Sequence, residues 1–224
     1  MNQEKKNQLI ASIRRLTDPN TKSDQIMKKS LVLQIPSKRR FLFLGLVAVI
    51  FFAIHHGMLV HSEDYIENFT DLLGNINDII VPTFAVIITG YAIFQALVNG
   101  STLINLMAVS EAEKSKFEEY NLYFFGLSLL YLGIIILNLL LMLFFKNVPA
   151  DWSLPFVSHQ VNEIIASVLM TVYLGILMHS LIELKSFVYN LFQCFTINAA
   201  SSGIDFLKEE QEKEKKKEQD RTDK

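Results

Sequence analysis

The stretch LYFFGLSLLYLGIIILNLLLMLFF, residues 122–145, carries no charged side chain and decides the class of fold. A helix needs about 20 apolar residues to cross a hydrocarbon core of roughly 30 Å, and this stretch is long enough. Its apolar residues are continuous rather than alternating, which indicates a helix and not a strand of a transmembrane barrel. Three further stretches share these properties, namely residues 41–60, 79–98 and 164–184.

Charged residues are concentrated outside these four stretches. Half of the 224 residues are hydrophobic and 20% are charged, and a soluble domain of this length would usually interleave the two kinds. The only formally charged side chain inside the stretches is Glu183. The single cysteine, Cys194, excludes an internal disulfide. We therefore predict an all-α polytopic membrane protein with four transmembrane helices.

The segments outside the predicted spans complete the organisation. In the first 40 residues, apolar residues recur at helical spacing on both sides of Asp18-Pro19-Asn20. The end of the chain carries seven basic and seven acidic residues and no apolar ones, so it cannot bury a core. The predicted organisation is a basic N-terminal arm (1–40), a four-helix transmembrane domain (41–184), an amphipathic extension of the fourth helix (185–207) and a charged C-terminal tail (208–224).

The distribution of Lys and Arg predicts the orientation. Residues 1–40 contain ten of them, residues 99–121 contain two, and the segment after Leu184 contains eight, which together make 20 of the 21. The predicted outer loops, 61–78 and 146–163, contain only Lys146. Because basic residues stay on the cytoplasmic side, we predict that both termini are cytoplasmic. The expected location is the inner membrane of a bacterium.

Two of the predicted loops carry helical signals of their own. Apolar residues between Tyr65 and Ile76 recur at helical spacing, which predicts a short helix in the first outer loop. In the inner loop, Ser110-x-x-Glu113 matches a capping box and predicts a short helix through Glu119.

A basic triplet, Lys38, Arg39 and Arg40, abuts the first predicted span. One interpretation places it on the anionic surface of the membrane, where each basic residue gains about 1 kcal/mol. The other is that it only enforces the orientation of the chain.

The fourth predicted span carries polar and small residues along one face. They step by four and then by three and four, and fall within an arc of roughly 120°. Polar groups in hydrocarbon face the bundle interior or a water-filled cavity, so this face either packs against neighbouring helices or lines a conduit. Two polar residues of other spans, Gln95 and Asn138, are candidates to face it. The seven residues of this polar face are Thr171, Gly175, His179, Glu183, Ser186, Asn190 and Gln193.

Spacing within the spans predicts further contacts. His179 and Glu183 form an i,i+4 pair that is either structural or a pH-responsive gate. Gly175 would permit close approach of a neighbouring helix. In the third span, Gly126 and Gly133 lie seven residues apart and also favour close packing.

Motifs for catalysis and metal binding are absent from the sequence. It has no H-E-x-x-H, G-x-S-x-G, P-loop or dinucleotide fingerprint, so we predict no enzyme and no cofactor. Four of the five histidines fall on the predicted outer half, but the adjacent His55 and His56 point to different sides of a helix and make a poor chelate. No metal site is expected. These four are His55, His56, His61 and His159.

Three functional hypotheses follow. The first is an oligomeric component that permeabilises the membrane or conducts across it, controlled by a cytosolic protein partner, as in a host-defence effector. The second is a non-conducting anchor, scaffold or immunity subunit that binds a cytosolic partner. The third is an intramembrane enzyme that acts on lipid or a redox carrier. The expected partners are the lipid bilayer, further copies of the chain and a cytosolic protein; direct binding of nucleic acid is not expected.

Overall fold

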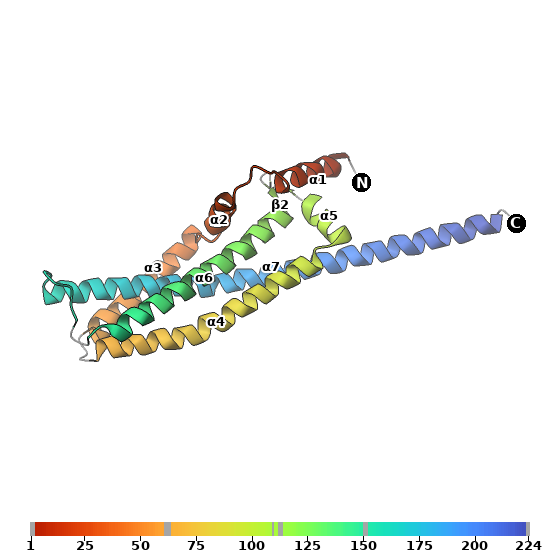
Figure 1. Cartoon of the computed structure of the whole chain (residues 1–224). Coiled ribbons are helices and arrows are strands. Elements are labelled where there is room, and N and C mark those ends of the chain that lie inside the picture. The colour runs from red at the N-terminus through yellow and green to blue at the C-terminus, as the bar shows by residue number, and fades with distance from the viewer. Residues whose placement is uncertain (1–2, 61–63, 109, 112–113, 150–151, 223–224) are drawn as a thin grey trace.

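The computed structural model describes residues 3–60, 64–108, 110–111, 114–149 and 152–222. Almost all of this part of the chain is helical (Figure 1). Two short segments, β1 (Ser110–Glu111) and β2 (Lys114–Ser115), pair antiparallel, and a π-helical turn, η1 (His55–Leu59), continues the third helix. The helices are α1 (Gln3–Leu16), α2 (Ser23–Val32), α3 (Lys38–Ile54), α4 (Tyr65–Leu97), α5 (Gly100–Ala108), α6 (Lys116–Asn147) and α7 (His159–Thr222).

Four helical segments are long and apolar enough to cross a membrane. They cover the four predicted spans except residues 59–60 and 98, so the prediction of an all-α chain with four helices long and apolar enough to cross a membrane is confirmed. Both termini lie at the same end of the molecule (Figure 1). The four segments are Lys38–Met58, Tyr65–Leu97, Lys116–Asn147 and His159–Gln219.

The first predicted outer loop is helical from Tyr65 onward, as predicted, but its helix is not separate from the second predicted span. Residues 61–63 lie outside the described residues, but α4 begins at Tyr65 and continues without a break through Leu97. Its first turns bury Phe69, Leu73 and Ile76 in one core cluster with side chains of α6 and α7. The helical spacing of these apolar residues was correctly recognised, but burial of their face joins them to the span instead of leaving a separate helix.

The inner loop also differs from its prediction. Ser110 does not cap a helix but lies in β1, which pairs with β2. The long helix α6 begins at Lys116, and its N-cap is Ser115, whose hydroxyl accepts a hydrogen bond from the Glu118 N–H (3.2 Å). Glu113 lies outside the described residues. The same kind of side chain therefore caps the helix, five residues later than predicted.

The last helix, α7, runs unbroken through the predicted span, the extension and most of the tail. Four of its buried residues, Ser180, Phe187, Cys194 and Ser201, recur every seven residues. This spacing keeps one edge of a long helix against its neighbours. Beyond Ser201, α7 projects away from the other helices (Figure 1).

The arm folds back on the bundle. Helix α1 lies beside α5, and α2 lies beside α6 (Figure 1). A Cβ atom at Gly126 of α6 would collide with the backbone carbonyl of Ser30 in α2. Only a glycine allows this close approach.

Helix α3 differs from the other long helices because it buries none of its residues. It packs mainly along α7, and large side chains such as Phe41, Leu42 and Val49 are more than 60% exposed. An apolar surface of this kind is suited to contact with lipid.

Candidate functional site

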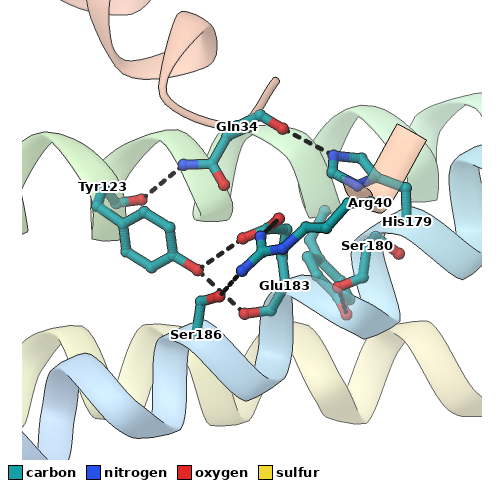
Figure 2. Close-up of polar contacts among 8 residues, drawn as sticks. Gln34, Arg40, Tyr123, His179, Ser180, Glu183 and Ser186 are labelled. Atoms are coloured by element: carbon teal, nitrogen blue, oxygen red, sulfur yellow. Dashed lines mark hydrogen bonds and ion pairs between the residues drawn. The ribbon is translucent and has the colours of Figure 1, made fainter. Parts of the chain in front are cut away.

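The polar side chains of the fourth span meet the end of the arm in one hydrogen-bonded cluster, which we call the junction network (Figure 2). Gln34 lies in the link between α2 and α3, and Arg40 lies in the first turn of α3. The network draws on three parts of the chain that are far apart in sequence. Its members are Gln34, Arg40, Tyr123, His179, Glu183 and Ser186.

Arg40 and Glu183 form the charged centre of the network. One guanidinium nitrogen of Arg40 pairs with the Glu183 carboxylate, and Nη2 donates to Ser186 Oγ (2.8 Å). Glu183 is 2% exposed, whereas the Arg40 side chain is 40% exposed. A buried carboxylate is stable only when it is paired and hydrogen-bonded. Of the three residues of the basic triplet, Arg40 therefore pairs with α7, while the side chains of Lys38 and Arg39 remain exposed.

Tyr123 of α6 holds Glu183 from the other side. Its hydroxyl lies 3.1 Å from Glu183 Oε2 and 3.0 Å from the Glu183 backbone oxygen. The backbone carbonyl of Tyr123 in turn accepts a hydrogen bond from Gln34 Nε2 (3.0 Å). The link between α2 and α3 is thus attached to α6 at the level of the buried carboxylate.

His179 does not pair with Glu183, contrary to the i,i+4 prediction. Its Nε2 lies 2.7 Å from the backbone oxygen of Gln34, so Nε2 carries the proton, because a carbonyl can only accept. Its Nδ1 is buried without a hydrogen-bond partner. Each of the two side chains therefore binds a different part of the arm–α3 segment, by which we mean the arm together with α3 (residues 3–54).

The remaining residues of the polar face lie on both sides of the network. Thr171 is buried and its hydroxyl has no hydrogen-bond partner, while Asn190 and Gln193 are half-buried. A Cβ atom at Gly175 would have no neighbour within 4 Å, so the expected close approach of a helix there is wrong. No residue of this face lines the groove between α4 and α7 or the cavity beside the first turns of α4.

The two residues expected to face this stripe lie elsewhere. Gln95 donates to Asn121 Oδ1 (2.8 Å) and is exposed. Asn138 is fully buried, donates to the Leu73 backbone oxygen (3.1 Å) and accepts from the Tyr173 hydroxyl. Because Tyr173 is two residues from Thr171, it points to a different side of α7. Asn138 therefore joins α4, α6 and α7 in a second, separate polar contact.

A third polar layer, which the sequence analysis missed, joins α5 to the extension of α7. Thr102 Oγ1 lies 3.0 Å from Asn198 Oδ1, and Asn105 Nδ2 lies 2.9 Å from Ser201 Oγ. The signal was the seven-residue spacing that continues from Cys194 to Ser201. Gln34 had no such signal, since it belongs to no periodic segment.

An apolar groove of about 300 Å³ lies between α4 and α7 on the side of the bundle. It is lined by Val86, Gly90 and Ile93 of α4 and by Phe187 and Leu191 of α7, among others. The Phe187 ring fills the space that a side chain at Gly90 would need. No charged side chain lines the groove, and Thr89 is the one polar residue among those that do.

The histidines do not assemble a metal site in the described part of the chain. His56 Nδ1 lies 3.3 Å from Ser167 Oγ, and its ring stacks on Phe52. His159 lies 3.2 Å from Glu163. His61 lies outside the described residues, and within them no group of three or more His, Cys, Asp or Glu side chains could hold a metal ion.

Comparisons with protein-family models, with curated proteins and with solved structures find no match. The class of protein therefore depends on the chain itself. Four helices long and apolar enough to cross a membrane make it a candidate multi-pass membrane protein. Its distinguishing feature is the junction network between the arm and the last of these helices.

Proposed function

We propose that the protein is a homo-oligomeric component of the bacterial inner membrane that permeabilises it or conducts across it, under control of a cytosolic partner. A host-defence effector that is triggered by a partner would have this organisation. In this proposal the arrangement described above is the closed form. The arm–α3 segment covers the polar face of α7, and release of the arm opens it.

The observation that carries the proposal is the cover over Glu183. This carboxylate is the only formal charge within the predicted spans, and Arg40 and Tyr123 enclose it. Movement of the arm–α3 segment would take Arg40 and Gln34 away from α7 together. Glu183 would then lose its charged partner and keep only the Tyr123 hydroxyl, and His179 would lose its partner. Contact with water between copies of α7 would satisfy both side chains.

The charge distribution supports the proposed orientation. Both termini lie at one end of the molecule (Figure 1), and 20 of the 21 Lys and Arg residues belong to segments on that side of the predicted spans. Placing this end in the cytoplasm puts the arm, α5 and the projecting part of α7 within reach of a cytosolic partner.

Dye release from liposomes tests the proposal. Arg40→Gln removes the partner of the buried carboxylate, so we expect it to release a trapped dye several-fold faster than the wild-type protein. Arg39→Gln makes the same charge change at an exposed position, and we expect it to behave like wild type. The double variant Arg40→Gln/Glu183→Gln removes the uncompensated charge and should lose most of the added release. The proposal would be overturned if the protein is a monomer in detergent and no variant releases dye from liposomes.

A second candidate function is a non-conducting anchor or scaffold, for example an immunity subunit. It is favoured by the projecting end of α7, where residues 206–219 are all exposed and where Lys213 pairs with Glu210 (3.3 Å) of the same helix. Because this part of α7 is exposed on every side, a partner could bind to any of its faces. Deletion of residues 208–224 should then abolish co-purification of a cytosolic protein and leave dye release unchanged at the wild-type level.

A further inference from the structure

Beyond the predicted fourth span, α7 presents an apolar face that no side chain in the described part of the chain covers. No charged residue lies between Lys185 and Asp205. The large side chains of this face are well exposed, more than 60% for Phe192 and Phe206. In the proposed orientation this part of α7 lies on the cytoplasmic side of the spans and outside the lipid. A contiguous apolar surface in water marks an interaction site.

The exposed residues of this face follow a heptad pattern. They step alternately by four and three residues, which is the spacing with which one helix packs along another. We call this set the α7 seam, and its members are Val188, Phe192, Phe195, Ala199, Ser202 and Phe206, all of them exposed. The next positions of the pattern are Lys185 before the seam and Glu209 after it, so the seam ends at a charge on both sides.

The α7 seam lies away from the contacts that hold α7 in the molecule. Phe192 is five residues past the buried Phe187, which places it about 140° round the helix. It is also nine residues, or about two and a half turns, past Glu183, so it points away from the junction network. A partner on the seam would therefore leave the junction network in place, and the closed form can carry it.

We infer that the α7 seam is the contact between two copies of this chain, whose α7 helices pack parallel and in register. The inference rests on the proposed function for the orientation and for the association of copies. Copies inserted in one membrane share one orientation, so their α7 helices run parallel and equivalent residues lie at equal height. Equivalent seam positions then meet, and because none of them is charged, no like charges are brought together.

The area of the α7 seam is sufficient for such a contact. A buried aromatic side chain contributes about 150–250 Å². Phe192, Phe195 and Phe206 each expose about half of their surface or more, so these three rings offer roughly 300 Å² per copy. With Val188 and the small residues between the rings, two copies would bury up to about 1,000 Å², the size at which specific interfaces begin. The small residues, Ala199 among them, allow the two backbones to approach closely.

Disulfide cross-linking of the purified full chain in liposomes tests the contact. A disulfide requires two Cα atoms within about 7 Å, which equivalent seam positions of a parallel pair can provide. After oxidation with copper phenanthroline, we expect most of the Ala199→Cys variant to run as a covalent dimer. The natural Cys194 stays in place, and since it is buried, wild-type protein should remain monomeric on the denaturing gel.

The matched control is Ala200→Cys. Ala200 is also exposed, but one residue further on it points about 100° away from Ala199, so we expect several-fold less dimer. A second pair adds a charge to the Ala199→Cys variant. Phe206→Glu should remove most of the dimer, because equivalent carboxylates would meet in the seam, whereas Leu207→Glu, at the same exposure of 61%, should leave it unchanged. All of these changes replace exposed side chains, so circular dichroism should show wild-type helix content.

Equal cross-linking of Ala199→Cys and Ala200→Cys would reduce the contact to random collision and overturn the α7 seam. Absence of dimer from both variants would overturn the second copy as the occupant. The face would then belong to lipid if a water-soluble maleimide cannot label Ala199→Cys in nanodiscs, and to a different protein if it can. Dye release plays no part in this experiment, so a cross-linked dimer without dye release would contradict the proposed conduction and leave the seam standing.

Discussion

Arg40, in the first turn of α3, forms an ion pair with Glu183 of α7, 143 residues further along the chain. The pair joins the first turn of α3, where the predicted arm ends, to α7. Glu183 also accepts a hydrogen bond from the Tyr123 hydroxyl of α6. Three of the four long helices therefore meet at this carboxylate. The position of the arm and the burial of a charge are therefore linked.

Arg40→Gln should lower the stability of the fold, because it leaves Glu183 buried without its charged partner. Hydrogen bonds to charged groups contribute about 1.5–3 kcal/mol, and the partial exposure of Arg40 makes a loss within that range more reasonable than the larger loss of a fully buried pair. Denaturant unfolding in detergent, followed by circular dichroism, measures the change. Arg39→Gln is the control, with an expected change below about 0.5 kcal/mol.

The double variant Arg40→Gln/Glu183→Gln completes a thermodynamic cycle. If the pair acts as described, the double variant should be less destabilised than the sum of the two single variants. Strict additivity would show that Arg40 and Glu183 do not interact, and would remove the basis for linking the arm to α7.

Gly126→Ala should detach α2 from α6. The added Cβ would collide with the Ser30 carbonyl and lie 2.9 Å from Gln34 Nε2, and backbone cannot yield as a flexible side chain can. Gly133→Ala, one heptad away on the same helix, meets nothing within 4 Å and serves as the control. Limited proteolysis at the link between α1 and α2, residues 17–22, should become faster in Gly126→Ala only. Equal cleavage of both variants would show that α2 does not depend on this contact.

Composition predicted the four apolar helices, because the absence of charge over about 20 residues is a local property. It could not predict what covers the polar face of α7. His179 and Glu183 satisfy the helical spacing of a pair, but Gln34 and Arg40 compete for them from the arm–α3 segment. Contacts across so many residues leave no periodic signal in a single sequence.

The two glycines of α6 show the same limit of prediction from a single sequence. Gly126 and Gly133 are indistinguishable by spacing, yet only Gly126 lies against another helix. The difference arises from the path of α2, which depends on the whole fold. Likewise, the apolar spacing around Phe69 and Leu73 indicated a helix, but that this helix continues the second span depends on its packing against side chains of α6 and α7.

Tyr173→Phe should destabilise the fold by about 1–3 kcal/mol, because it leaves the oxygen of the fully buried Asn138 without its donor. Replacing both partners, in Tyr173→Phe/Asn138→Leu, should recover part of this loss, since neither side then holds an unsatisfied group. Unfolding in detergent measures both variants. A double variant that is less stable than the sum of the single losses would contradict the role assigned to this contact.

The projecting part of α7 should contribute little to stability. Ending the chain at Leu207 removes residues 208–219, which are exposed along α7, and exposed i,i+3 pairs such as Lys213–Glu210 contribute only a few tenths of a kcal/mol. The helical signal should fall with the lost residues, while the midpoint of thermal unfolding stays at the wild-type value.

Ending the chain at Thr196 provides the contrast. This truncation also removes Asn198 and Ser201, which bond to Thr102 and Asn105 of α5. Each such hydrogen bond contributes about 0.5–1.5 kcal/mol, so the midpoint should fall clearly below that of the chain ending at Leu207. Equal midpoints for the two truncations would mean that α5 is not held by α7, and the end of the molecule proposed to meet a cytosolic partner would then need a different anchor for α5.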